Sequence, residues 1–267
     1  MLDVVFGQAS DPGRVRTNNE DSVGSFVPTS QHQARSHGYL FTVADGVGGL
    51  DLGEVASSTA VSVLTREFEN SPADAMLISL LPMLVQRANS AVHDRTFAPE
   101  YHGKKMATTV VTCALRYDQA VISHVGDSRC YLVRNGLAKQ VTHDHSWVNE
   151  QRGLGLITEA EISRSRSRHV LVRTLGAETI VTPETIALTI QPGDVLVLCS
   201  DGVHDEIRDS TIASIVSQSK PIDEIARELV DIAVSENGND NTTAVVIKIR
   251  SVEQANTYRG RTHHLSC

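Results

Sequence analysis

Four aspartates stand where an apolar segment of this chain begins or ends, and each is a candidate ligand for a cation. Asp45 and Asp201 each follow an apolar run and precede a glycine, Asp127 interrupts a third run, and Asp240 stands just before a fourth. An apolar, β-branched run that stops at glycine predicts a buried strand whose end places the aspartate beside accessible backbone. One Asp-Gly pair alone is more often only a turn, so the recurrence is what indicates a shared site.

The donors in this pattern are all oxygen atoms, because Gly46 adds a backbone carbonyl to the carboxylates. Hard oxygen ligands favour magnesium, manganese or calcium over zinc or copper. Several carboxylates in one cleft would repel one another unless more than one cation neutralised them, which predicts a two-metal centre. Such a centre acidifies a bridging water and stabilises a phosphoryl group under in-line attack.

A cationic side chain, Arg16, precedes Glu20 and Asp21 in a polar segment near the N-terminus. Taken alone, this segment reads as a solvated turn. Beside a metal centre, the planar guanidinium of Arg16 could hold phosphate oxygens, with the two carboxylates at the rim of the metal site.

The elements that must position these residues belong to one globular domain of the α/β or α+β class. The chain has 267 residues, of which 40% are hydrophobic and only 4% aromatic, so the core must be built from Val, Leu, Ile and Ala. A formal net charge of −8 argues against nucleic acid or an anionic membrane as partner. The sequence has no apolar run of membrane-spanning length and no signal peptide at its start, so we expect a cytoplasmic location.

No internal repeat or linker divides the chain, and strands from both halves would have to meet to bring the four aspartates together, so we expect a single domain over residues 1–250. Helical spacing of apolar residues predicts helices over 52–70, 72–97, 209–217 and 222–237, with Pro82 kinking or splitting the second. Strands are predicted over 39–45, 108–116, 119–125, 130–134, 194–200 and 242–249. Strands in direct succession are expected to pair antiparallel. Residues 24–38 predict a loop or short hairpin, and 251–267 a flexible C-terminal tail.

The four cysteines show no close-paired zinc spacing, and three of them lie within predicted strands, which indicates buried, reduced thiols. They are Cys113, Cys130, Cys199 and Cys267.

The segment 142–173 has a different pattern from the rest. His143 and His145 flank Asp144, and such residues can bind zinc, but the sequence shows no third or fourth ligand. A mobile lid or solvated loop with short helices is the better interpretation. Its end is basic, which fits attraction to acidic substrate segments and a solvated face equally well; the residues are Arg164, Arg166, Arg168, His169 and Arg173.

Taken together, the motifs resemble those of metal-dependent type 2C (PPM) serine/threonine protein phosphatases in their compact bacterial form. The matching stretches, in order, are RTNNED at 16–21, VADGVGG at 43–49 with GEVAS at 53–57, MATT at 106–109, VGDSR at 125–129, LCSDGV at 198–203 and GNDNTT at 238–243. The resemblance spans residues 7 to about 249. It implies an α+β fold, a four-layer α-β-β-α sandwich with two central antiparallel β-sheets flanked by helix pairs.

The resemblance also implies a role for each motif residue. Asp45 would bridge two core metals, the carbonyl of Gly46 would bind one of them, and the second would be completed by Asp201 and Asp240. Asp127, together with Asp201, would hold a weaker third metal. The implied cofactors are therefore two or three manganese or magnesium ions.

Three further implications concern the rim of the cleft. Glu20 or Asp21 would act on the second metal through water, and Arg16 would bind the substrate phosphate. Residues about 145–168 correspond to the family's flap, a variable segment beside the cleft. Some relatives have a histidine, proposed as general acid, where this chain has Val47. A metal-bound water is then the expected acid, with His143 and His145 as alternatives.

The implied function is hydrolysis of phosphoserine and phosphothreonine in proteins by a metal-bridging water or hydroxide, in opposition to a serine/threonine kinase. We expect a monomer with phosphoprotein substrates. A catalytically inactive phosphoprotein-binding scaffold of the same fold is the alternative, although such proteins usually lose metal ligands. A calcium-binding structural protein is a third hypothesis, but the chain lacks the spacing of a calcium hand and this hypothesis leaves Arg16 unexplained.

Overall fold

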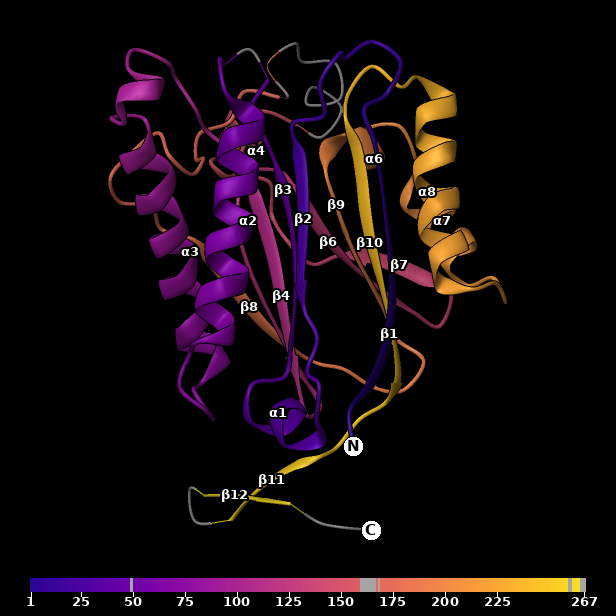
Figure 1. Ribbon diagram of the computed structural model, residues 1–267. Helices are drawn as coiled ribbons and strands as arrows, with labels where there is room; N and C mark the ends of the chain where they lie inside the picture. Colours follow the sequence, from indigo (N-terminus) through magenta and orange to yellow (C-terminus); the bar gives the residue numbers. More distant parts are fainter. Residues whose placement is uncertain (49, 159–166, 168, 259–260, 265–267) are drawn as a thin grey trace.

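Two five-stranded antiparallel sheets pack face to face between two layers of helices (Figure 1). This computed structural model describes residues 1–48, 50–158, 167, 169–258 and 261–264, and from residue 255 onward only the backbone. The strand orders are β2-β3-β4-β5-β8 and β1-β10-β9-β6-β7. The predicted four-layer α-β-β-α sandwich is therefore confirmed.

The first sheet is covered by two long helices. Its strands are β2 (Asp21–Phe26), β3 (Tyr39–Asp45), β4 (Val110–Arg116), β5 (Gln119–Val125) and β8 (Glu184–Thr189). The helices are α2 (Gly53–Glu69) and α3 (Leu77–Arg95). Their apolar faces bury Leu64, Phe68 and Leu84 against this sheet.

The second sheet is covered by a shorter helix pair. Its strands are β1 (Asp3–Asp11), β6 (Arg129–Arg134), β7 (Leu137–Gln140), β9 (Val195–Cys199) and β10 (Thr242–Ser251). The helices are α7 (Asp209–Val216) and α8 (Ile222–Glu236). The remaining elements are α1 (Gln31–Ser36), η1 (Pro99–Tyr101), α4 (Trp147–Gly153), α6 (Asp201–His204), β11 (Ala255–Tyr258) and β12 (Arg261–His264).

A third apolar layer lies between the two sheets. Phe41 and Val43 of β3 meet Leu196 of β9 and Val245 of β10 there, and all four are buried. The core consists largely of aliphatic side chains, as the composition predicts. Cys113, Cys130 and Cys199 are buried and free, which confirms the prediction for these three; the side chain of Cys267 lies outside the described residues.

The chain changes sheets between β5 and β6, which corrects one prediction. β4 and β5 pair antiparallel as expected, with Tyr117 at φ 59° in the turn between them. β5 and β6 do not pair, because β6 pairs with β7 and β9 in the other sheet. Gly126, at φ 102°, turns the backbone out of the first sheet. Asp127 therefore lies at the junction of the two sheets.

One local prediction was wrong, and one alternative of another is excluded. Residues 24–38 form the end of β2 and helix α1, whose N-cap Ser30 accepts a hydrogen bond from the backbone N–H of Gln33. Pro82 does not split α3, which is one helix beginning at Leu77, while a kink at Pro82 stays a prediction. The carbonyl that Pro82 leaves without a helical partner belongs to Ile78, an exposed residue, so water can bond to it.

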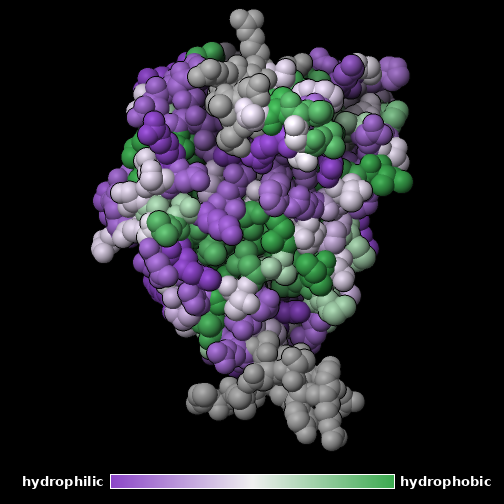
Figure 2. Space-filling model, turned by 180° about the vertical axis from the view of Figure 1, so that it is seen from behind, coloured by the Kyte–Doolittle hydropathy of each residue, from purple (hydrophilic) through white to green (hydrophobic). Residues whose placement is uncertain are grey.

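Residues 251–267, predicted as a flexible tail, begin with the last residue of β10 and include an antiparallel ribbon in which β11 pairs with β12. Their flexibility stays a prediction. Among the described residues, no helix combines the length and hydrophobicity needed to cross a bilayer. Seen from the opposite side, hydrophobic residues lie in separate groups among hydrophilic ones (Figure 2).

Candidate metal centre and phosphate site

The four aspartates predicted from the strand ends lie together. Asp45 is the last residue of β3, Asp201 opens α6 directly after β9, and Asp240 stands two residues before β10. Asp127 comes from the crossover between β5 and β6. All four line one cleft of about 390 Å³. Strands from both halves of the chain thus meet at one site.

Arg16 and Gly46 line the same cleft. The Nη2 of Arg16 donates to Oδ2 of Asp240 at 2.8 Å, and its side chain is 39% exposed. The guanidinium lies against Gly48, where a Cβ would come within 3.0 Å of it. Asp240 raises the pKa of Arg16 through this hydrogen bond. The guanidinium is therefore charged at the cleft mouth, where an anionic oxygen can reach it.

Asp21 lies directly beside Asp45, because the two residues face each other across the β2–β3 ladder. Its Oδ2 accepts a hydrogen bond of 2.8 Å from Oγ of Ser200, while its buried Oδ1 has no partner. Glu20 is half-buried, with its carboxylate packed on Gly53. Neither Glu20 nor Asp21 lines the cleft itself, whereas Asp45, the partner of Asp21 across the ladder, does.

Burial and mutual repulsion raise the pKa of these carboxylates. Burial raises the pKa of Asp21 and of Asp127 to about 7, and the neighbouring charge of Asp201 adds to both shifts. Asp45 has its pKa raised well above the usual range by burial and then by Asp21 and Asp201. A cluster that resists ionisation in this way becomes stable as carboxylates only when cations neutralise it.

Threonines of the segment before β4 hold the backbone of Asp45 in place. Oγ1 of Thr108 donates to the carbonyl of Asp45 at 2.8 Å, and Oγ1 of Thr109 accepts from its N–H at 3.1 Å. Thr109 also shares a 2.6 Å hydrogen bond with the hydroxyl of Ser128, beside Asp127. These contacts show that the two threonines of the MATT stretch support Asp45 and the turn beside Asp127, a role that the sequence alone does not reveal.

Asn241 is a second positioning residue that sequence reasoning missed. Its Nδ2 donates to the carbonyls of Pro12 and Asn18 at 3.0 and 2.9 Å. Its Oδ1 accepts from the N–H of Glu20 at 2.8 Å. Asn241 thus ties the loop that carries Arg16 to the start of β10, and only its place next to Asp240 could have signalled this role.

Val47 lines the cleft, so an apolar side chain occupies the position after the Asp-Gly pair. His169 lines it too, with Nδ1 3.4 Å from Oδ2 of Asp205, and was missed as a cleft residue. His143 and His145, the alternative proton donors, do not line this cleft. His143 borders a neighbouring cleft instead, and His145 is buried.

Asp144, the centre of the His-Asp-His pattern, is occupied by an ion pair. Arg129 donates to both of its carboxylate oxygens at 2.9 and 2.6 Å. The two ends of the segment pair with each other, through a bridge between Ser146 and Leu171. The middle, residues 159–166 and 168 with their three arginines, lies outside the described residues.

Comparison with known proteins decides the family. A model of protein phosphatase 2C matches residues 14–239. The chain belongs to the protein phosphatase 2C family. A putative protein phosphatase 2C-type of Streptococcus pyogenes is 32% identical over 240 residues, covering 89% of this chain and 94% of that protein. Serine/threonine phosphatase stp of Listeria monocytogenes is 31% identical over 255 residues, covering 94% and 96%.

Solved structures of phosphatase 2C relatives share the fold. The serine/threonine phosphatase PstP/Ppp of Mycobacterium tuberculosis has a TM-score of 0.81 at 31% identity, covering 94% of this chain and 100% of that chain. The catalytic domain of PstP in complex with 2 manganese ions has a TM-score of 0.79 at 31% identity, again covering 94% and 100%. The resemblance drawn from the sequence motifs is thereby confirmed.

The residues of this cleft fit divalent cations. Asp45, Asp127, Asp201 and Asp240 offer only carboxylate oxygens, and Gly46 adds backbone without a side chain to block it. A Cβ at Gly46 would lie 2.4 Å from the carbonyl carbon of Gly53, so no other residue fits at this position. The unpartnered Oδ1 of Asp21 is an acceptor that a metal-held water would satisfy.

Proposed function

We propose that this protein is a metal-dependent phosphatase that removes phosphate from phosphoserine and phosphothreonine in proteins and so opposes a serine/threonine kinase. The observation that carries the proposal is the single cleft lined by four aspartates, Gly46 and Arg16. Membership of the protein phosphatase 2C family supports the reaction class. All the motif carboxylates are in place, which favours an enzyme over an inactive scaffold.

In this proposal Asp45 and Gly46 hold the core cations, with Asp201 and Asp240 completing the set. Asp127, with Asp201, holds a weaker third ion, and Glu20 and Asp21 act from behind through water. The cofactors are two or three manganese or magnesium ions, in line with the 2 manganese ions bound by PstP. When bound, these ions supply an acidified water and neutralise the charge that develops on the phosphoryl group.

The chain's own residues orient the substrate. Arg16 presents a planar set of N–H donors at the cleft mouth, a geometry suited to two phosphate oxygens at once. Asp240 holds this guanidinium in place by the 2.8 Å hydrogen bond before substrate arrives. No histidine follows Gly46, neither His143 nor His145 reaches the cleft, and His169, which lines it, is paired with Asp205. We therefore assign the proton for the leaving alkoxide to a water in the cleft.

The proposal also covers the domain organisation, the location and the partners of the protein. Residues 1–250 form the catalytic domain, with about 145–168 as its flap and 251–267 as a tail. The protein works in the cytoplasm as a monomer. Its partners are phosphorylated proteins and the kinase that modifies them. The names of the stp and PstP relatives support the substrate class.

The decisive test compares phosphothreonine with phosphotyrosine peptides under added manganese. We expect hydrolysis of the phosphothreonine peptide at least about tenfold faster, and complete loss of hydrolysis after treatment with a chelator, because the cations supply the nucleophile and charge neutralisation. Phosphate release is the measurement. Activity that persists in chelator, or a preference for phosphotyrosine, would contradict the proposed function.

Removal of the guanidinium should weaken substrate binding and leave the metal centre intact. We expect Arg16→Ala to raise KM for a phosphopeptide by about tenfold or more, and Arg16→Lys to recover only part of the loss, because an ammonium cannot bind two oxygens in one plane. Initial rates over a range of peptide concentrations measure this. Arg14→Ala, two residues away and outside the cleft, is the matched control and should behave as wild type. An unchanged KM in Arg16→Ala would remove Arg16 from the phosphate site.

A further inference from the structure

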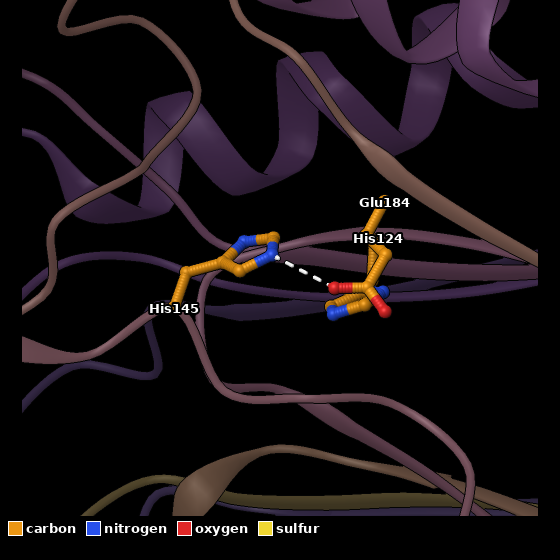
Figure 3. Close-up of side chains that lie close together, drawn as sticks. All are labelled: His124, His145 and Glu184. Atoms are coloured by element: carbon orange, nitrogen blue, oxygen red, sulfur yellow. Dashed lines mark ion pairs between the residues drawn. The ribbon is translucent and has the colours of Figure 1, made fainter. Parts of the chain in front are cut away.

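A group of three side chains, His124, His145 and Glu184, lies close together where the flap begins at His145 (Figure 3). His124 comes from β5, Glu184 from β8, and His145 from the segment after β7. The rings of His124 and His145 are stacked, with centroids 4.7 Å apart. Nε2 of His145 lies 3.6 Å from Oε2 of Glu184, the contact marked by the dashed line in Figure 3.

His145 forms hydrogen bonds with both backbone polar groups of Gly126, its N–H and its carbonyl. Its backbone N–H donates to the carbonyl of Gly126 at 2.9 Å. Its ring Nδ1 accepts from the backbone N–H of Gly126 at 3.2 Å. We call these two hydrogen bonds the Gly126 clamp. Because Gly126 directly precedes Asp127, the clamp fixes the backbone next to a carboxylate of the cleft.

The clamp defines the tautomer of His145. Because Nδ1 accepts a hydrogen bond, the neutral ring carries its proton on Nε2, which faces Glu184. Burial, followed by the nearby His124 and Arg173, lowers the pKa of His145 to about 4, so the ring stays neutral near pH 7. The ring is 6% exposed and stacked on His124, and its orientation is therefore fixed.

The same tautomer argues against a metal ion within this group. The ligand atoms of His124, His145 and Glu184 lie within 4.8 Å of one another, as a zinc site would require. His124 suits ligation, because its Nε2 donates to the carbonyl of His143 at 2.9 Å and its buried Nδ1 is unpartnered. His145 does not, because its Nε2 would have to lose the proton that the Gly126 bond places there. The group therefore fits a support that is held by the hydrogen bonds to Gly126 and His143 and by the stacking of the two rings, with Nε2 of His145 beyond hydrogen-bond distance of Glu184 at 3.6 Å.

Other contacts hold the residues after Gly126 in the same way. Nε2 of His204 donates to the carbonyl of Asp127 at 3.0 Å. The hydroxyls of Ser128 and Thr109 bond at 2.6 Å. A Cβ at Gly126 would come within 2.6 Å of the side chain of Thr109, so the backbone of the turn packs closely against Thr109. The ring of His145 is the part of this support that reaches Glu184 and the flap base.

We propose that His145 is a positioning residue that holds Asp127 in the geometry required by the weakest metal site of the cleft. This inference rests on the proposed function, in which Asp127 is a ligand of that site. His145 also accepts from the N–H of Val172 at 2.9 Å through its carbonyl, so it connects the start of the flap and Val172, which follows the flap, to the Asp127 turn.

Two substitutions of His145 separate positioning from simple packing. Asparagine places an acceptor where Nδ1 stands, whereas glutamine is larger but places its polar group where Nε2 stands. We expect His145→Gln and His145→Ala to raise the manganese dissociation constant of the weakest site by about tenfold or more, and His145→Asn to stay within about threefold of wild type. A purely packing role predicts the reverse order, because glutamine fills more of the space.

Manganese binding, followed by electron paramagnetic resonance and calorimetry, is the readout, with thermal unfolding to confirm that each variant folds. In an Asp127→Asn background the His145 substitutions should have no further effect, because the ligand they position is gone. His32→Ala, an exposed histidine in α1, is the surface control. Equal binding by the asparagine and glutamine variants would overturn the inference, as would one equivalent of zinc binding to the manganese-loaded protein and lost in His124→Ala.

These outcomes are separable from those of the proposed function. Wild-type protein that binds manganese but hydrolyses no phosphopeptide would refute the phosphatase proposal and leave the His145 comparison readable. Hydrolysis with identical manganese binding in all three His145 variants would refute only the positioning role.

Discussion

Replacement of Asp45 by asparagine is expected to lower kcat for phosphopeptide hydrolysis by about a thousandfold or more. Loss of several kcal/mol of charge stabilisation by metal ions corresponds to a rate change of this size. Asparagine keeps the shape of the side chain but removes the charge that faces Asp21 and Asp201. The metal-free variant should therefore be more stable than metal-free wild type, while manganese should no longer raise its melting temperature.

Steady-state kinetics and thermal unfolding with and without manganese measure both halves of this prediction. Asp94→Asn is the matched control, because Asp94 is 81% exposed and does not line the cleft. It should show wild-type kinetics and a wild-type response to manganese. Asp45→Asn protein that turns over substrate at the wild-type rate would remove Asp45 from the metal centre.

The metal-free protein should lose stability as pH rises from about 4 to about 7. Asp21 and Asp127 have pKa values raised from 3.8 to about 7 in the folded state. A group with a raised folded pKa stabilises the fold while it is protonated and loses that contribution as pH rises through the folded pKa. The expected loss in the free energy of unfolding is on the order of a few kcal/mol. Asp144, whose pKa is lowered by its pairing with Arg129, titrates below this window.

Melting temperatures of chelator-treated protein between pH 5 and pH 8 test this directly. Manganese should remove most of the pH slope, since it binds the ionised carboxylates and should stabilise the fold more at pH 8 than at pH 5. In Asp21→Asn the slope should be shallower, whereas Asp94→Asn should keep it. A melting temperature that rises with pH in the absence of metal would show that the aspartates are ionised without cost.

The central strands and amphipathic helices were predictable because burial imposes a period on the sequence. β3, β9 and β10 lie inside the sandwich and read as apolar runs, and α8 has a continuous apolar face. All four edge strands, β1, β2, β7 and β8, were missed. Their residues are mostly half-buried or exposed, so none shows an apolar run, and each is defined by its pairing with an inner strand of its sheet.

Part of the cleft was also predictable from the sequence. Asp45 and Asp201 carry a local signal, an apolar run that ends in Asp-Gly, so their place at a sheet edge follows from the sequence. His145 carries no such signal, because its role depends on Gly126, 19 positions earlier in the chain, and its ring lies beside Glu184 of β8. The predicted pairing of β5 with β6 was wrong because local sequence does not decide it. A three-residue turn fits a hairpin and a change of sheet equally well.

The candidate metal centre lies at the junction of the two sheets, so bound cations would connect them. Asp21 and Asp45 belong to the first sheet, whereas Asp201 and Asp240 adjoin strands of the second. The hydrophobic attraction in the apolar layer between the sheets is non-directional. Cations held by these four aspartates would connect the two sheets at that edge, so local opening of either sheet there would require loss of the ions. Metal binding would therefore raise the free energy of local opening at the cleft and couple the two sheets there.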